Sequence, residues 1–188
     1  MASDEYNRGR KEALAQVVTY VNGLLVAIAT EPGESPAPKG QPYPGPHPDL
    51  RTIHALYVQL SKGTQKDPDA MFSVFLHETA EGKSRLWLQD CNPGGLKYHP
   101  GIAILGHAYG RDVGGGAIAY AKFPDPVTGV AAHFKFVSQS RYAMMNGRPA
   151  EEQIEALRAA GYIEAGMDQD WKRSVLHYVD LVRRGALG

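Results

Sequence analysis

The chain has 188 residues, of which 43% are hydrophobic and 21% charged, as expected for a folded domain with its own core. Twenty Lys and Arg residues balance twenty Asp and Glu residues, so the chain has no net charge that would attract nucleic acid or an anionic membrane. The single cysteine, Cys91, excludes an intramolecular disulfide and a cysteine-only zinc site.

The N-terminal stretch has two interpretations. Basic residues precede an apolar run that ends in Ala-Ile-Ala at residues 27–29, a pattern that resembles a signal peptide. Acidic residues lie in the would-be basic part, however, and polar residues interrupt the apolar run. Its apolar residues recur at helical spacing: Leu14, Val17, Val21, Leu24 and Ile28. These features favour an amphipathic core helix.

A proline-rich loop is predicted next. Seven of the thirteen prolines fall in residues 31–48, where they can neither continue a helix nor pair inside a sheet. We expect a surface connector in extended geometry, with a proline motif for a partner protein as the alternative. Residues 1–48 are thus predicted to form a helix and loop that extend the domain of residues 49–188.

Helical patterns dominate the next part of the chain. A helix is predicted over residues 50–61, with one apolar face made of Ile53, Leu56, Tyr57 and Leu60. Asp67 and Pro68 predict the start of a second helix, since Asp caps a helix N-terminus and proline suits the first turn. We expect this helix to end near Gly82. Its predicted buried stripe consists of Met71, Phe72, Phe75, Leu76 and Thr79.

The rest of the chain combines a glycine-rich segment with further helices. Residues 92–122 predict an irregular hairpin or small sheet, carried by the apolar runs GIAIL and GAIAYAKF. Three helices are predicted over residues 126–139, 149–160 and 168–184. The expected fold is therefore α+β and mostly α, with one small Gly-rich β lobe.

Several motifs that carry chemistry in other proteins are incomplete here. The EGKS segment lacks the first glycine of a phosphate-binding loop, because His77 stands in its place. His77, Glu78 and Glu81 lack the second histidine of a helical zinc site. The GRDVGGG segment does not have the spacing of a dinucleotide-binding loop. We expect no cofactor and no metal, and we interpret Cys91 as a small buried hydrophobe rather than a nucleophile.

Glu78 is the candidate catalytic residue. It follows Phe75 and Leu76 near the last turn of a predicted helix, where apolar neighbours and the negative end of the helix dipole both disfavour ionisation. The pKa of its carboxyl group is therefore expected to be raised. A carboxyl group that stays protonated near neutral pH can donate a proton to a leaving oxygen, as glycoside hydrolysis requires. A solvated residue at a helix end is the alternative.

Five ordered segments carry a resemblance to a known family. They are ETAEGKSRL, NPGGLKY, YAKFPDPVTGVAAHFKFV, SRYA and ALRAAGYIEAGMDQDWKRSVLHYV, and they lie within residues 68–180. Their order and spacing resemble the bacterial glucosaminidases of glycoside hydrolase family 73. Glu81 and Gly94 depart from the pattern, because the family commonly has an aromatic residue and a phenylalanine at these positions.

The resemblance implies a lysozyme-like fold over residues 49–188, with a helical lobe, a small Gly-rich β lobe and a cleft between them. It implies an endo-β-N-acetylglucosaminidase that cleaves the β-1,4 bond after N-acetylglucosamine in peptidoglycan, with Glu78 as general acid. The small residues Ala80 and Gly82 would let the chain turn sharply after this acid.

The resemblance also suggests a second catalytic group. Tyr142, in the Arg-Tyr motif, would stabilise the oxocarbenium-like centre or position a water, with core packing as the alternative. Asp112 would activate water from a mobile Gly-rich lid, with an ordinary turn position as the alternative. The N-acetyl group of the substrate is another candidate nucleophile. The predicted substrate-binding residues are Asn92, Lys97, Tyr98, Tyr109, Tyr120 and Phe123.

Two other functions remain open: a muramidase or lytic transglycosylase on the same fold, and a non-catalytic module that binds the cell wall. For any of these the expected partner is the glycan strands of peptidoglycan, with no nucleic acid and no membrane span. We expect action in the bacterial periplasm or cell wall. Because the signal peptide is unconvincing, delivery by a phage particle or a secretion apparatus, or export of a precursor, is expected.

Overall fold

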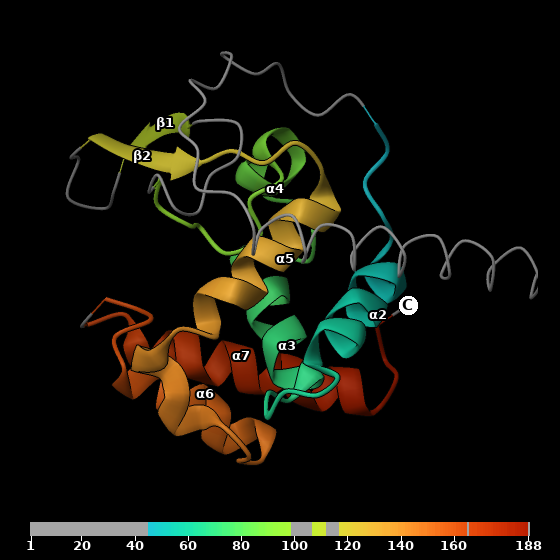
Figure 1. Cartoon of the computed structure of the whole chain (residues 1–188), viewed down its shortest axis with the longest axis vertical. Helices are drawn as coiled ribbons and strands as arrows, with labels where there is room; N and C mark the ends of the chain where they lie inside the picture. Colours follow the sequence, from blue (N-terminus) through green and yellow to red (C-terminus); the bar gives the residue numbers. More distant parts are fainter. Residues whose placement is uncertain (1–44, 99–106, 112–116, 165, 188) are drawn as a thin grey trace, which may run out of the picture. The chain divides into compact units, whose positions relative to one another are not determined.

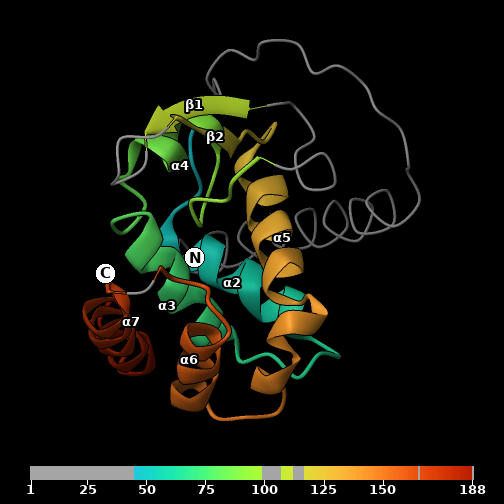
Figure 2. The ribbon, with the colours of Figure 1, turned by 90° about the vertical axis from the view of Figure 1, so that its left-hand side faces the viewer.

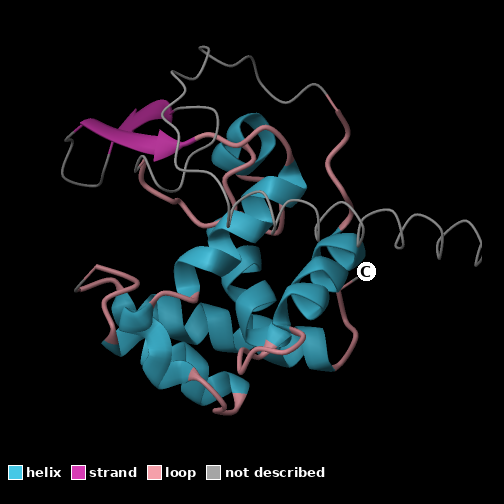
Figure 3. Cartoon of the chain, in the orientation of Figure 1, coloured by secondary structure: helices cyan, strands magenta, loops and turns pink. Residues whose placement is uncertain are grey.

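The computed structural model describes residues 45–98, 107–111, 117–164 and 166–187, with no side chains described for 107–111 and 117. Within these ranges helices predominate, and two short strands form one hairpin (Figure 3). The predicted N-terminal helix and most of the proline-rich loop lie outside the described residues. The prediction that residues 1–48 extend the same domain therefore stays a prediction.

Helix α3 (Pro68–Glu78) lies in the middle of the helical part (Figure 1). As predicted, Asp67 caps the start of this helix, because its carboxylate accepts hydrogen bonds from the N–H groups of Asp69 and Ala70. Pro68 lies in the first turn, also as predicted. Residues 70–76 are all buried, which indicates that α3 has neighbours on every side. These neighbours are α2 (Leu50–Ser61), α6 (Ala150–Ala159) and α7 (Asp168–Arg183).

The predicted helices agree with the structure apart from small differences at their ends. The prediction for α2 is confirmed, including its buried face. Helix α5 (Pro126–Val137), α6 and α7 match the other three predicted segments. Two short elements were missed, namely α4 (Arg85–Asp90) and the 3-10 helix η1 (Ser140–Met145). Neither is long enough to show a helical period in its sequence.

Helix α3 ends at Glu78, before the predicted end near Gly82. The N–H of Glu81 donates to Leu76 O at 2.8 Å, a hydrogen bond typical of a helix C-terminus. The hydroxyl of Thr79 also accepts from the N–H of Gly82 at 2.9 Å. The next three residues adopt left-handed backbone conformations: Ala80 (φ 48°), Glu81 (φ 57°) and Gly82 (φ 80°). Outside glycine this conformation costs about 1–2 kcal/mol per residue. The sharp turn expected after the candidate acid is thus confirmed.

Strands β1 (His107–Arg111) and β2 (Ala117–Ala121) pair antiparallel, with His107 opposite Ala121. On the other side of β2, the N–H of Tyr98 donates to Ala119 O at 2.6 Å, and the N–H of Ala121 donates to Leu96 O at 2.8 Å. The run GAIAYAKF therefore contains a strand, as predicted. The run GIAIL lies outside the described residues, and the described partner strand begins after it.

The hairpin is tied to the helices through the segment after α4 (Figure 2). The side chain of Asn92 is 1% exposed and binds backbone groups on both sides, with distances of 2.9 Å to Leu96 N, Leu96 O and Ala121 O. Beneath it lies an apolar cluster of Cys91, Leu96, Ala121, Phe123 and Ala132. A Cβ at Gly129 would come within 1.9 Å of Cys91 O, so only glycine lets α5 pack this closely.

Candidate functional site

Glu78 is the last residue of α3, and its carboxyl group is partly buried. The indole Nε1–H of Trp171, in the first turn of α7, donates a hydrogen bond to Oε1 of Glu78 at 3.0 Å. Burial raises the pKa of Glu78 to about 7, and the hydrogen bond from Trp171 opposes this rise. The carboxyl group is thus about half protonated at neutral pH, in agreement with the expected raised pKa.

The second carboxyl oxygen of Glu78 faces the turn that leads to the hairpin. A Cβ at Gly95 would lie 3.9 Å from Glu78 Oε2. Because glycine has no side chain, residue 95 does not cover this oxygen. At Gly94 a Cβ would come 2.8 Å from Cδ2 of His133 and 3.1 Å from the hydroxyl of Tyr162. The phenylalanine common in the family has no room at position 94 unless these neighbours shift.

A buried chain of hydrogen bonds joins Tyr57, His133 and Tyr162. The hydroxyl of Tyr57 is 2.7 Å from Nδ1 of His133, and Nε2 of His133 is 3.0 Å from the hydroxyl of Tyr162. Burial lowers the pKa of His133 to about 4, so the imidazole is neutral at pH 7 and one ring nitrogen donates while the other accepts. Burial also raises the pKa of Tyr162 well above its ordinary value, and the charge of Glu78 raises it further. Tyr162 and Glu78 both contact Trp171, Tyr162 through its ring and Glu78 through a hydrogen bond.

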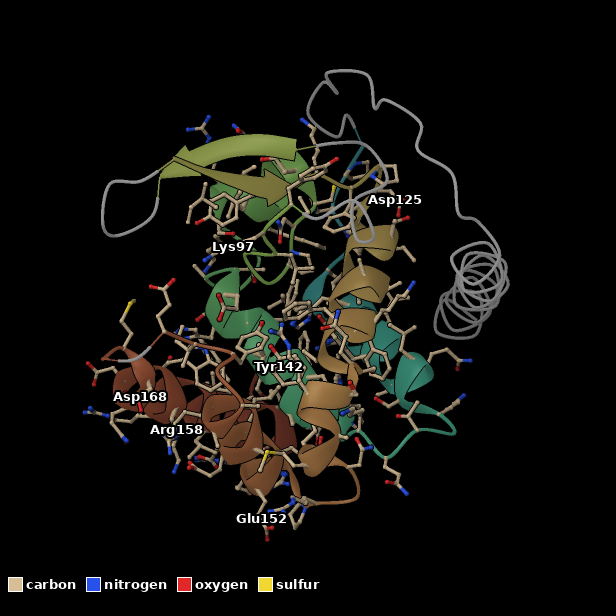
Figure 4. The ribbon with its side chains drawn as sticks, turned by 60° about the vertical axis from the view of Figure 1, so that its left-hand side comes forward. Lys97, Asp125, Tyr142, Glu152, Arg158 and Asp168 are labelled. Carbon is tan, nitrogen blue, oxygen red and sulfur yellow. The ribbon has the colours of Figure 1, made fainter. Side chains whose placement is uncertain are left out.

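An aromatic row leads from Tyr142 to Trp171. The ring centroids are 6.2 Å apart for Tyr142 and Tyr162, and 5.6 Å apart for Tyr162 and Trp171. Tyr142 is 1% exposed, and its buried hydroxyl has no hydrogen-bond partner among the described residues. Figure 4 shows Tyr142 among the helices. The guanidinium of Arg141 lies over its ring, 4.5 Å from the centroid.

Two of the predicted substrate-binding residues are interior ones. Asn92 makes the backbone hydrogen bonds that hold the hairpin, and Phe123, 2% exposed, belongs to the apolar cluster under it. Both positions therefore support the hairpin from inside. Contact with a substrate stays a prediction for these two residues.

The other predicted binding residues lie on or near the hairpin. Lys97 (Figure 4) and Tyr98 are exposed and Tyr120 is partly buried. Nζ of Lys97 is 3.5 Å from a carboxylate oxygen of Glu164. Tyr109 is in β1, and its side chain is outside the description. The proposed second acid, Asp112, and the lid around it also lie outside the described residues. Substrate binding by all of these residues stays a prediction.

Two residues near Glu78 were not singled out from the sequence. Trp171 contacts the carboxyl group directly, and Tyr162 joins the aromatic row to the buried histidine. Both belong to the closing segment ALRAAGYIEAGMDQDWKRSVLHYV, which carried part of the family resemblance. The signal that was available is that this segment holds three aromatic residues, Tyr162, Trp171 and Tyr178.

The described residues contain no cluster of three or more His, Cys, Asp or Glu side chains able to hold a metal ion. Burial raises the pKa of Cys91 to about 12, so its thiol stays protonated and is a poor nucleophile. Within the same ranges, no helix combines the length and the apolar character that a membrane crossing needs.

The solved structures that are similar to this chain include three hydrolases. The glycoside hydrolase domain of FlgJ from Salmonella typhimurium has a TM-score of 0.55 at 13% identity and covers 74% of this chain and 91% of its own. A peptidoglycan hydrolase from Sphingomonas sp. A1 has a TM-score of 0.58 at 16% identity, and the match covers 71% of this chain and 89% of the hydrolase. The catalytic domain of the autolysin Auto from Listeria monocytogenes has a TM-score of 0.54 at 15% identity, and the match covers 71% of this chain and 84% of that domain. This likeness confirms the expected mostly helical, lysozyme-like fold.

Comparison with curated proteins gives no match. A family model described as "Glucosaminidase: Mannosyl-glycoprotein endo-beta-N-acetylglucosaminidase" matches residues 54–183, which include Glu78, the hairpin and the aromatic row. The match spans more than half of the chain, and it agrees with the resemblance carried by the five ordered segments. The chain therefore belongs to the glucosaminidase family of glycoside hydrolases.

Proposed function

We propose that the protein hydrolyses the β-1,4 bond after N-acetylglucosamine in peptidoglycan, with Glu78 as the general acid. The proposed substrate class is supported by family membership and by the peptidoglycan hydrolase among the similar folds. The proposed mechanism rests mainly on one observation, the partly buried carboxyl group of Glu78 at the end of α3, hydrogen-bonded to Trp171. Burial raises the pKa of this group to about 7. Such a group keeps a proton near neutral pH and releases it readily, as an efficient general acid must.

In the proposed reaction the proton of Glu78 passes to the glycosidic oxygen as the bond from this oxygen to the sugar carbon breaks. The hydrogen bond from Trp171 then stabilises the carboxylate that forms. Water completes the hydrolysis at the sugar carbon. For the second group we propose Asp112 as the residue that activates this water and Tyr142 as a dipole near the positive sugar centre. The N-acetyl group of the substrate is the alternative nucleophile.

The decisive test is Glu78→Gln, assayed by release of reducing sugars from purified cell walls. We expect the wild-type rate to fall as pH rises through about 7, because the acid form is lost, and the variant rate to be at least about 10²-fold lower. The matched control is Glu152→Gln, which changes an exposed acid on α6 and should keep full activity. Equal activity in wild type and Glu78→Gln would contradict the proposal.

Mass spectrometry of the released fragments identifies the bond. N-acetylglucosamine at the reducing end supports the proposal, whereas N-acetylmuramic acid or an anhydro sugar there supports the muramidase or lytic transglycosylase alternative. Muropeptide binding of equal strength in wild type and Glu78→Gln, without turnover in either, supports a non-catalytic wall-binding module.

We further propose that the protein acts in the bacterial periplasm or cell wall, where peptidoglycan lies. Delivery by a phage particle or a secretion apparatus, or export of a precursor, would bring it there. Fractionation of producing cells distinguishes these routes, because an exported enzyme accumulates in the periplasm without lysis.

A further inference from the structure

The contact between Trp171 and Glu78 joins two elements far apart in the sequence. Trp171 is 3% exposed, and its indole Nε1–H donates to Glu78 Oε1 across a separation of 93 residues. The ring is held by aromatic neighbours on two sides: its centroid is 5.6 Å from that of Tyr162 and 6.3 Å from that of His77. His77 is in turn hydrogen-bonded to Ser174, one turn further along α7, at 2.9 Å. The indole N–H therefore has a defined direction.

An indole N–H donates and cannot accept a hydrogen bond. In a protonated carboxyl group the carbonyl oxygen is the better acceptor, and the other oxygen carries the proton. We propose that Trp171 is a positioning residue that makes Oε1 of Glu78 the accepting oxygen and thereby keeps the transferable proton on Oε2. This inference rests on the proposed function, because it says which oxygen of the general acid delivers the proton.

The surroundings of Oε2 agree with this assignment. Oε2 faces Gly95, where a Cβ would be 3.9 Å away. A proton on Oε2 therefore lies on the side of the turn that precedes the hairpin. After transfer of the proton to the glycosidic oxygen, Glu78 is a carboxylate that still accepts from Trp171, so this hydrogen bond is present before and after the step.

Other ionisable groups near the pair have to be separated from Glu78 in any titration. Burial lowers the pKa of His77, which packs on the Trp171 ring, so His77 titrates at a lower pH than Glu78. Tyr162 and Tyr142 have raised pKa values and stay neutral. His133 has a lowered pKa and stays neutral. Further groups lie in and opposite the turn after α3: the partly buried Glu81 and Tyr178 and the exposed Lys83. None of these groups is removed by Glu78→Gln.

The direct test is NMR of the indole N–H groups in the full chain, which has only two tryptophans, Trp87 and Trp171. The signal of Trp171, assigned with Trp87→Phe, should shift with a midpoint near pH 7, because its acceptor gains charge there. In Glu78→Gln this transition should vanish, while any change from His77 at lower pH persists. A Trp171 signal that does not move near pH 7, or moves equally in Glu78→Gln, overturns the proposal.

Kinetics provide the second test. Trp171→Phe keeps an aromatic ring but removes the donor, so kcat should fall about tenfold or more, since the acid is no longer oriented, with KM changed less than about twofold. The alkaline limb of the pH profile should move up by about half a unit to one unit, because a hydrogen bond that favours the carboxylate is lost. Trp171→Tyr, which restores a donor, should return the limb toward the wild-type position.

The matched control is Trp87→Phe, which removes an equally buried indole from α4 without removing the donor to Glu78. It should lower stability and leave the alkaline limb in place. A limb that stays in place in Trp171→Phe, or moves equally in Trp87→Phe, contradicts the positioning role. If the wild type has no hydrolytic activity, the proposed function fails, whereas the NMR titration still decides whether Trp171 controls the carboxyl group.

Discussion

Tyr142 has a hydroxyl that is buried yet has no hydrogen-bond partner among the described residues. Tyr142→Phe removes this hydroxyl and keeps the ring in its place in the aromatic row. Removing an unpartnered polar group should leave the free energy of unfolding unchanged or raise it by about 1 kcal/mol. If the hydroxyl stabilises the positive sugar centre, as proposed, kcat should nevertheless fall at least about tenfold.

Urea unfolding and the rate of sugar release measure the two effects separately. The control is Tyr178→Phe, because the hydroxyl of Tyr178 is only partly buried and donates to Glu81 at 3.2 Å. This control should keep full activity. Tyr142→Phe with full activity would assign Tyr142 to the core alone, which is the alternative interpretation of its sequence motif.

At the scale of elements, the hairpin depends on one side chain, that of Asn92. Its amide binds four backbone groups, two on Leu96 and one each on Ala121 and Gly94. Asn92→Ala leaves these groups without this partner in a buried place, which should lower the free energy of unfolding by about 2–4 kcal/mol. Urea unfolding measures the loss, and amide hydrogen exchange should become faster at Leu96 and Ala121.

Asn146→Ala is the matched control, since Asn146 is exposed at the end of η1 and its loss should change stability by less than about 0.5 kcal/mol. Equal stability of the two variants would refute the supporting role of Asn92. A raised KM in Asn92→Ala at unchanged stability would instead support the predicted contact with substrate.

At the scale of the whole molecule, two buried groups link folding to pH with opposite signs. The pKa of Glu78 is raised from 4.5 to about 7, so its contribution to stability is fully present below pH 4.5 and is lost as pH rises through 7. The pKa of His133 is lowered from 6.5 to about 4, so its contribution is present above pH 6.5 and is lost as pH falls through 4. Between pH 4 and 7 a rise in pH therefore lowers the stability through Glu78 and raises it through His133.

Glu78→Gln should expose this linkage. Because glutamine does not ionise, the variant should gain about 3 kcal/mol of unfolding free energy relative to wild type between pH 4.5 and 8. Urea unfolding at several pH values measures this difference, and Glu152→Gln should show no such trend. A difference between Glu78→Gln and wild type that is constant with pH would mean that the carboxyl group is not perturbed by folding.

Much of the fold and one candidate site residue could be predicted from local signals. Asp67 and Pro68 mark the start of α3 because capping involves only neighbouring residues, and the buried faces of α2 and α3 show in their apolar spacing. Glu78 was found because its position at the end of that helix is itself local. The end of α3 was placed too late, since the chain leaves the helix in a left-handed conformation at Ala80 and Glu81, two residue types that do not predict such a turn.

The sequence by itself thus determined the helices, the hairpin region and the candidate acid, because caps, periodicity and turn residues act over a few positions. Only the tertiary structure decided what surrounds that acid. Trp171 meets Glu78 across 93 residues, and Tyr57 meets His133 across 76. Such contacts depend on how α7 packs on α3 and α2 on α5, which is set jointly by all the side chains between the helices.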